Sequence, residues 1–297
     1  MESEKEIVIK VPWGKLTALS WGDPSHPPVL LCHGRLDACT SYRPLVQHLP
    51  RNYYYVSVDL PGNGRSDHFP RGAKLLVSDF LPALERLRDH FKWDKYIFVG
   101  HSLGAGLGKF LNALNPGQIT HLVDLDPLPA YISAIKNLKF WYKYSYGIVF
   151  GEEDYDKLLA GPETAPKYSY EEARDKLMKA RGVTKEAAEH VLERSLDPAG
   201  DGLYRFTYDQ RFKNFLFFPF LNDSLKEFYT GPSTPTLAIF ASIPVSQGFY
   251  KEFPFALNDS EWKNNNYKHV VVKGGHDIHL TKPEEVATHI SEFLKNN

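Results

Sequence analysis

A serine stands between two glycines in the stretch FVGHSLGAG, residues 98–106, and could act as a nucleophile. The apolar run before it predicts a strand, and LGAGLGKFLNAL at 103–114 predicts a helix that begins directly after Ser102. A serine on such a tight turn has a strained backbone and an exposed hydroxyl at the positive end of the helix dipole. Ser102 is therefore our candidate nucleophile, and the alternative is a serine that only caps the helix.

A serine nucleophile needs a general base at the same edge of the sheet. In VVVKGGHDIHLTKPEE, residues 270–285, His276 follows the last predicted strand through two glycines and so lies on a loop at that edge. His279 is the competing candidate, because it could face the pocket or fix the loop. The H-D-x-H pattern lacks a third metal ligand at suitable spacing, so we predict no metal.

The carboxylate that would orient the histidine is harder to assign. The strand predicted at 235–242 is followed by IPVSQGFYKEF, which contains no aspartate, and its Glu252 lies well past the strand. Asp126 ends an earlier strand at the same edge, next to the strand of the nucleophile, whereas Asp124 lies deeper in that strand. We favour Asp126 because a carboxylate only has to reach Nδ1 of the imidazole.

The stretch LLCHGRLDA, residues 30–38, ends the third predicted strand with a His-Gly pair. We expect the backbone N–H groups of Arg35 and Leu103 to bind the oxygen of a tetrahedral intermediate. The side chain of Arg35 adds a cation beside the mouth, which would either favour acidic substrates or point to solvent, and we favour solvent. The substrate contacts that we expect come from His33, Gly34, His101 and His279.

Short apolar runs alternate with helical patterns, which predicts a mostly parallel sheet of the α/β class. The eight predicted strands lie at 6–12, 15–21, 28–33, 53–59, 95–100, 119–126, 235–242 and 267–275, and helices are expected at 73–91, 103–114 and from Pro283 onward. Residues 127–231 show charged helical segments and no convincing strand. We therefore predict a core of residues 1–126 and 232–297, with a helical lid at 127–231.

The charge and the cysteines limit the classes of partner. The 35 basic and 36 acidic residues nearly cancel, so no net field would attract nucleic acid or an anionic membrane. The two cysteines, Cys32 and Cys39, lack metal spacing and are expected to be reduced thiols. No run is apolar enough for a secretory signal or a membrane span. We expect a cytoplasmic monomer or homodimer, with the peroxisome as the alternative location, that acts on a small molecule.

The lid segment bears on the substrate. Aromatic residues crowd FWYKYSYGIVF at 140–150 and YRFTYDQRFKNFLFFPF at 204–220, and either pack the lid on the sheet or line an apolar pocket over Ser102. Both roles remain open. Charged lid segments such as EEARDKLMKARG, residues 171–182, are interpreted as solvated faces without a role.

Five motifs in this order resemble the α/β-hydrolase superfamily: HG at 33–34, DLPGNGRSD at 59–67, GHSLG at 100–104, LVDLDPLP, and GGHDIHLTKPEEVA. Within it the chain is similar to the serine-hydrolase-like and kraken group of animal proteins. The resemblance implies an eight-stranded sheet flanked by helices, a lid after strand six, and a Ser102, Asp126 and His276 triad with Arg35 and Leu103 as backbone donors. The DLPGNGRSD loop is expected to be structural, with Arg65 and Asp67 paired locally.

These residues together predict a serine hydrolase, similar to carboxylesterases, that cleaves a hydrophobic ester or thioester without a cofactor. Serine at 102 argues against the dehalogenases and epoxide hydrolases of this fold, which use aspartate. Two alternatives stay open because a fold does not fix function. One is a cofactor-free lyase or oxygenase, and the other is a ligand receptor that has lost turnover.

Overall fold

The computed structural model describes residues 4–72, 75–127, 139, 142–143, 156, 159–214 and 222–296. All eight predicted strands are present and form one sheet in the order β1-β2-β4-β3-β5-β6-β9-β10. Their bounds are β1 Lys5–Val11, β2 Gly14–Trp21, β3 Pro28–Cys32, β4 Tyr54–Asp59, β5 Tyr96–His101, β6 Ile119–Leu125, β9 Thr236–Ala241 and β10 Tyr267–Val272. Strands β1 and β2 are antiparallel to their neighbours and the others are parallel, which confirms the predicted mostly parallel sheet.

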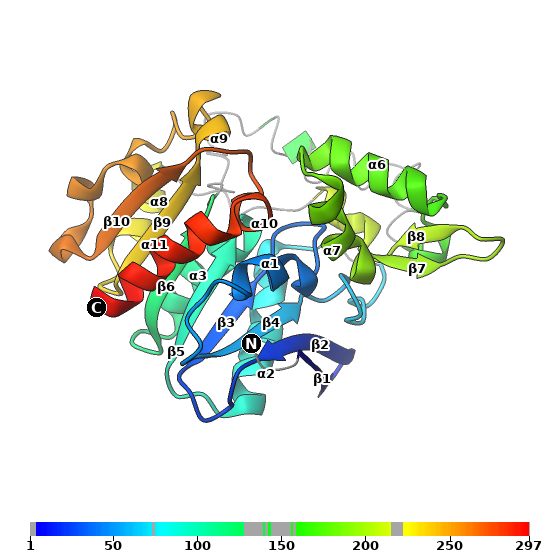
Figure 1. Ribbon diagram of the computed structural model, residues 1–297, viewed down its shortest axis with the longest axis horizontal. Coiled ribbons are helices and arrows are strands. Elements are labelled where there is room, and N and C mark those ends of the chain that lie inside the picture. The colour runs from blue at the N-terminus through cyan, green and yellow to red at the C-terminus, as the bar shows by residue number, and fades with distance from the viewer. Residues whose placement is uncertain are drawn as a thin grey trace.

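Helices cover both faces of this sheet (Figure 1). Those packed on the sheet are α1 Arg43–Val46, α2 Leu81–Phe91, α3 Leu103–Leu114, α8 Asn222–Thr230, α9 Ser242–Ser246, α10 Ile278–Thr281 and α11 Pro283–Asn296. Shorter 3₁₀ turns occur at Cys39–Tyr42, Val77–Phe80, Pro162–Thr164, Gln210–Asn214, Pro254–Leu257, Asp259–Glu261 and Lys263–Asn265. Among the described residues, no helix combines the length and the apolar character needed to cross a bilayer.

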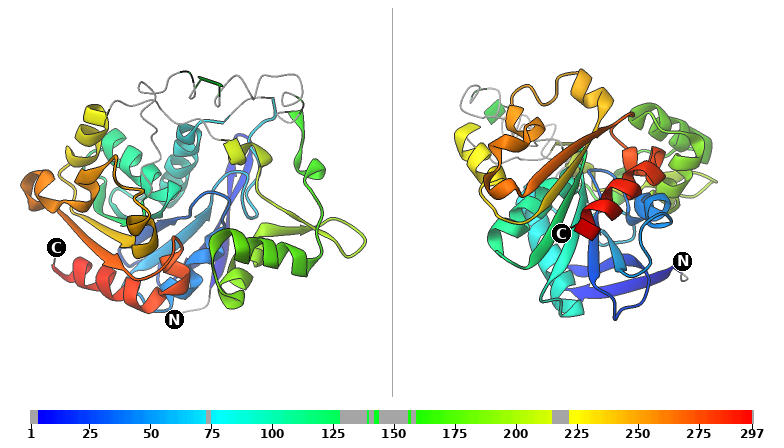
Figure 2. Two further views of the ribbon diagram at one scale, coloured as in Figure 1. Left: turned by 90° about the horizontal axis from the view of Figure 1, so that it is seen from above. Right: turned by 60° about the vertical axis from the view of Figure 1, so that its left-hand side comes forward.

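Two apolar layers hold the helices to the sheet. Residues of α2 and α3 pack with one face, around Phe80 and Phe98, and residues of α1 and α11 pack with the other, around Leu45 and Ile290. The right-hand view of Figure 2 shows these helix pairs on opposite sides of the sheet. Side chains that alternate along each strand supply both layers, which explains why the central strands are apolar throughout.

Between β6 and β9 the chain leaves the sheet. The described residues 159–214, which we call the cap, contain α6 Tyr170–Arg181, α7 Lys185–Ser195 and a hairpin of β7 Leu196–Pro198 and β8 Tyr204–Phe206. These elements lie together outside the main sheet (Figure 1). Helix α6 begins at a capping box of Ser169 and Glu172 and ends at Gly182 in the left-handed conformation.

The hairpin corrects the expectation that residues 127–231 contain no strand. Its strands are only three residues long, too short to show a period of two, and Asp201 and Gly202 make its turn with positive φ. Helix α8 also differs from the lid assignment, because Leu225 and Tyr229 pack with Phe240 of the sheet. The aromatic residues within 140–141, 144–150 and 215–220, which we expected to pack the lid on the sheet or to line a pocket, lie outside the described residues.

Candidate functional site

Ser102 lies on the predicted tight turn between β5 and α3. Its φ of 53° and ψ of −112° are rarely adopted by residues with a side chain, so the turn is strained. A Cβ atom on Gly104 would lie 2.1 Å from the carbonyl oxygen of Cys32, so only glycine allows α3 to approach β3 this closely. The backbone N–H of Ser102 donates to the carbonyl oxygen of Leu125 at 3.0 Å. That bond fixes the serine beside the end of β6.

The structure brings Asp126 and His276 together. Nδ1 of His276 lies 2.5 Å from Oδ2 of Asp126, and this carboxylate is fully buried. An ionised carboxylate only accepts, so Nδ1 carries the proton and Nε2 keeps a free lone pair. Strand register explains the pairing, because Leu125 of β6 lies beside Ile239 of β9, and the end of β9 at Ala241 lies beside Val272 of β10. The residues that follow these strands therefore meet at one edge of the sheet.

The last residue of β9 and a tyrosine in the segment after it bind the other oxygen of Asp126. The backbone N–H of Ala241 donates to Oδ1 at 2.8 Å, and the hydroxyl of Tyr250 donates to it at 3.0 Å. Burial raises the pKa of Tyr250 well above its ordinary value, and the charge of Asp126 raises it further. Tyr250 therefore stays protonated. The sequence reasoning missed it, because it searched this segment for a carboxylate rather than for a donor.

The alternative acids lie elsewhere. Asp124 is buried and forms an ion pair with Lys109 of α3, with 3.0 Å between Oδ2 and Nζ. Glu252 is exposed, beyond Tyr250, and does not line the cavity described below. Of the three acids weighed in the sequence, only Asp126 bonds His276.

The His-Gly turn after β3 packs directly against the serine. A Cβ atom on Gly34 would lie 2.9 Å from Nδ1 of His101 and 3.2 Å from Cβ of Ser102. The absence of a side chain thus lets the backbone of residues 34–35 approach the nucleophile closely. Leu103 is the first residue of α3, where a backbone N–H has no intrahelical partner.

A cavity of about 390 Å³ opens between the sheet edge and the cap. Ser102, His101 and His276 line it from the core side, and residues of α6 and β8 line it from the cap side. The full lining is Arg35, Leu36, His101, Ser102, Lys176, Leu177, Ala180, Arg181, Phe206, Tyr208, His276 and Asp277. Arg35 is exposed, as expected, and also lines the cavity. Helix α6 lines it too, although its charged segment was predicted to have no role.

Two of the histidines that we expected to contact the substrate form hydrogen bonds with backbone atoms. His33 is fully buried, its Nε2 accepts from the N–H of Leu60 at 3.0 Å, and its Nδ1 donates to the carbonyl oxygen of Gly34 at 2.7 Å. We therefore reassign His33 to the structure of the turn. His101 lines the cavity, but its Nε2 donates to the carbonyl oxygen of His276 at 3.0 Å. Burial lowers the pKa of His101 well below its ordinary value, so the ring stays neutral.

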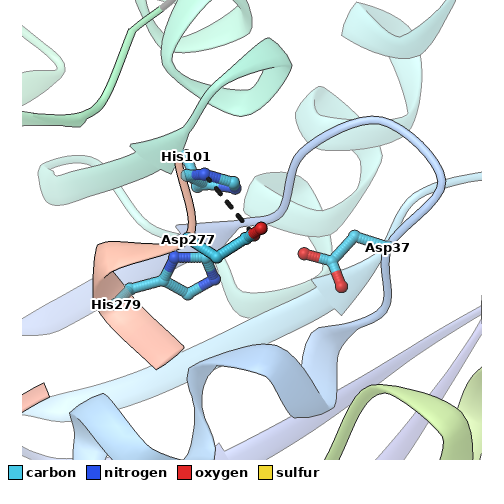
Figure 3. Close-up of side chains that lie close together, drawn as sticks. All are labelled: Asp37, His101, Asp277 and His279. Atoms are coloured by element: carbon cyan, nitrogen blue, oxygen red, sulfur yellow. Dashed lines mark ion pairs between the residues drawn. The ribbon is translucent and has the colours of Figure 1, made fainter. Parts of the chain in front are cut away.

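His279, the competing base, is buried behind the loop. Its ring lies 4.2 Å from that of His101 and 5.3 Å from that of Tyr42, and both of its ring nitrogens are buried with no hydrogen-bond partner among the described residues. It lies in a cluster with Asp37 and Asp277 (Figure 3). Burial lowers the pKa of His279 to about 4. We therefore reassign it from substrate contact to packing.

The cluster of Asp37, His101, Asp277 and His279 has ligand atoms within 4.8 Å of one another, as a metal site would. Arg181 of the cap, however, donates to Asp37 at 3.0 and 3.1 Å and pairs with both oxygens of Asp277. Burial opposes the charge of Asp37, but Arg181 outweighs it and lowers the pKa of Asp37 to about 2. A guanidinium already binds both carboxylates, so we interpret the cluster as an ion-pair network.

A second cap arginine joins the core at the motif beginning with Asp59. Arg194 of α7 is buried and donates from Nε to Oδ2 of Asp59 at 2.8 Å. The local pair expected between Arg65 and Asp67 does not form; Arg65 donates to Glu6 at 2.7 Å, and Asp67 accepts from the backbone N–H of Lys15 at 2.9 Å. The DLPGNGRSD loop forms structural contacts within the core, as predicted. Through Asp59 it also binds Arg194 of the cap.

Comparison with known proteins places this geometry in a family. The family model of the alpha/beta hydrolase fold matches residues 27–283. A serine hydrolase-like protein of Danio rerio is 28% identical over 98% of this chain and 88% of its own length, and serine hydrolase-like protein 2 of Homo sapiens is 25% identical over 98% and 94%.

Among solved structures, the thioesterase domain from the curacin biosynthetic pathway superposes with a TM-score of 0.73 at 22% identity, over 97% of this chain and 99% of that domain. The resemblance to the α/β-hydrolase superfamily, and to serine-hydrolase-like proteins within it, is confirmed. The chain belongs to the alpha/beta hydrolase fold family.

Proposed function

We propose that this protein is a serine hydrolase that cleaves a hydrophobic ester or thioester through an acyl-enzyme intermediate. The observation that carries the proposal is the 2.5 Å contact between His276 and the buried Asp126, with His276 and Ser102 lining the same cavity. These are the parts that nucleophilic acyl transfer requires: an activated hydroxyl, a base and a group that orients the base. The names of the serine hydrolase-like relatives support the same reaction class.

In the first half-reaction, Nε2 of His276 takes the proton of the Ser102 hydroxyl while Oγ attacks the carbonyl carbon. The backbone N–H groups of Leu103 and Arg35 stabilise the resulting oxyanion, and Asp126 stabilises the imidazolium. When the intermediate collapses, the imidazolium returns its proton to the leaving oxygen or sulfur. The acyl group then remains on Ser102.

In the second half-reaction, water repeats these steps. His276 takes a proton from the water, whose oxygen attacks the acyl carbon, and the collapse of the second intermediate returns the proton to Ser102. The bonds that Asp126 receives from Ala241 and Tyr250 keep its carboxylate oriented through both halves. The buried histidine at 101 fixes the backbone of the base by its bond to the carbonyl oxygen of His276.

The cavity wall favours an apolar substrate. Leu36, Leu177, Ala180 and Phe206 give it an apolar lining close to Ser102. Apolar walls with a few convergent polar groups are usual for small-molecule sites. The structural likeness to a thioesterase domain is a likeness of fold, so it leaves esters and thioesters as equal candidates.

A fluorophosphonate probe tests the proposal most directly. The wild-type chain should be labelled at Ser102, and the Ser102→Ala variant should not be labelled. A Ser66→Ala variant is a matched control, because that serine is buried away from this cavity. Lack of labelling of a folded wild-type protein would remove the hydrolase proposal and favour a ligand receptor.

A further inference from the structure

The cavity beside Ser102 carries more positive than negative charge. Arg35, Lys176 and Arg181 contribute cations to its lining, and among the described lining residues Asp277 contributes the one carboxylate. Arg181 is already paired with Asp277 and with the buried Asp37. The positive charges of Arg35 and Lys176 therefore remain without a counter-charge in the lining.

A third cation, Lys213, lies at the same rim. Nη1 of Arg35 donates to the carbonyl oxygen of Lys213 at 3.2 Å, and the ammonium group of Lys213 lies 5.8 Å from the ring centre of the cavity residue Tyr208. Partial burial lowers the pKa of Lys213, and the like charge of Lys176 lowers it further. The two lysines are thus close enough to repel each other.

These cations come from three separate segments: the turn after β3, helix α6, and the 3₁₀ turn Gln210–Asn214. In the described part of the chain, none of the three forms an ion pair with a carboxylate. The ammonium group of Lys176 instead lies 5.2 Å from the ring centre of Tyr168. Convergent like charges destabilise one another, and a bound anion would remove that cost.

Solvated lysines on a helix need no ligand, but α6 segregates its charges. Lys176 and Arg181 line the cavity, while Asp175 pairs with Arg174 and Glu172 caps the helix start, so neither acid lies in the lining. Two of the four basic side chains of α6 therefore line the cavity, and none of its three acids does.

We propose that the substrate carries an anionic group, a carboxylate or a phosphate, at the end remote from the scissile carbonyl, and that Arg35, Lys176 and Lys213 bind it. This inference rests on the proposed hydrolase function and names its substrate class. The apolar lining by Leu177 and Phe206 contacts the chain between the two ends. The reacting carbonyl lies at Ser102 and the anion at the rim.

Matched esters test the charge preference with the full-length chain. The neutral substrate is the p-nitrophenyl ester of monomethyl suberate, and the carboxylate substrate is p-nitrophenyl hydrogen suberate, which has the same chain without the methyl group. A third ester of similar length ends in a phosphate. We expect kcat/KM to be about tenfold higher for an anionic ester than for the neutral one, and the preference to fall as salt is added. The better of the two anions identifies the group.

Lys176→Gln supplies the critical variant, and Lys179→Gln is its control, because Lys179 is exposed on the same helix and does not line the cavity. We expect Lys176→Gln to lower the ratio of kcat/KM for the better anionic ester to kcat/KM for the neutral ester about fivefold. Arg35→Gln should lower this ratio by a similar factor. Lys179→Gln should leave the ratio as in wild type. Thermal unfolding of each variant checks that it is folded.

Equal kcat/KM for neutral and anionic esters in wild type would overturn the inference, and so would equal effects of the two lysine variants. Fluorophosphonate labelling of Ser102 separates this failure from a failure of the proposed function. A labelled enzyme without charge preference refutes only the anionic substrate. An unlabelled, folded enzyme refutes the hydrolase itself.

Discussion

His276 and His279 lie three residues apart after β10, and each has an aspartate nearby, but their surroundings differ. The side chain of His276 is 32% exposed, lines the cavity and bonds the buried Asp126. His279 is fully buried, and the carboxylates near it, Asp37 and Asp277, are bound by Arg181. His276 is therefore accessible from the cavity, as the proposed base must be, and His279 is not.

The difference shows what turns a histidine–aspartate pair into a base. Reach to the substrate and a carboxylate left free to stabilise the imidazolium are both required. Near His279, Arg181 neutralises the negative charges of Asp37 and Asp277. Burial keeps the imidazole of His279 neutral. The second cluster thus joins the cap to the core, and the first is the pair to which we assign the proposed chemistry.

Replacing His276 and His279 one at a time gives the largest expected difference in kcat. His276→Ala should lower kcat by about 10⁴-fold or more, because the hydroxyl loses its base. His279→Gln removes the competing imidazole and should reduce stability rather than kcat. Steady-state hydrolysis of a p-nitrophenyl ester, with thermal unfolding of both variants, measures the contrast. A larger loss of kcat in the His279 variant would reverse our assignment.

Removing the charge of Asp126 tests the other half of the pair. Asp126→Asn should lower kcat by about 10⁴-fold, because an amide stabilises the imidazolium poorly and favours the wrong tautomer. Glu252→Gln, on the exposed segment after Tyr250, should change kcat little. Comparable activity in the two variants would leave Asp126 without a catalytic role.

The buried ion pairs of Arg181 are expected to matter for stability. Arg181→Met leaves Asp37 and Asp277 without their partner, and breaking a buried pair in this way costs about 3–5 kcal/mol of unfolding free energy. Lys179→Met changes an exposed residue of the same helix and should have little effect. Chemical denaturation of both variants makes the measurement. Equal stability would mean that this pair does not hold the cap.

The pH dependence of stability distinguishes the two histidines further. His279 has a pKa of about 4 in the fold, and an unfolded histidine has one of about 6.5. The unfolded state therefore binds more protons between these values, so stability falls as pH drops from 6.5 towards 4, by about 3 kcal/mol for this group. The titratable and charged groups that act on His279 are Asp277, Asp37, Arg181 and His276. Burial also lowers the pKa of His101, so this histidine contributes to the pH dependence with the same sign.

The check is a series of denaturation measurements between about pH 6.5 and 4 on the wild type and two variants. His279→Gln should lose less stability than wild type on acidification, whereas His90→Gln, an exposed histidine of α2, should follow the wild type. Parallel curves for all three proteins would show that the fold does not lower the pKa of His279.

The sequence predicted the sheet and the reactive turn because both depend on local patterns. Apolar runs mark the strands, and the glycines around Ser102 mark the close approach of α3 to β3. Asp126 and His276 followed from topology, since residues at the ends of parallel strands share an edge. Each of these inferences used residues within or directly after a predicted strand.

The cap residues were not predictable in this way. Arg181 and Arg194 look like solvated charges in α6 and α7, and only the docking of the cap shows that they meet Asp37, Asp277 and Asp59. The β7–β8 hairpin is too short to show a strand pattern. Contacts between distant segments carry no local signal, so the ion pairs of these two arginines could not be inferred from their spacing.

Tyr250 gives the smallest and most specific test. In the segment where a carboxylate was expected, its hydroxyl donates to Asp126 at 3.0 Å, alongside the backbone of Ala241. Tyr250→Phe keeps the ring and removes this one bond, which is worth about 1 kcal/mol, so kcat should fall about fivefold. Tyr267→Phe is a control, because that hydroxyl donates to the backbone of Ala256 and does not contact Asp126. An equal loss in both variants would indicate general loosening of the core rather than orientation of Asp126.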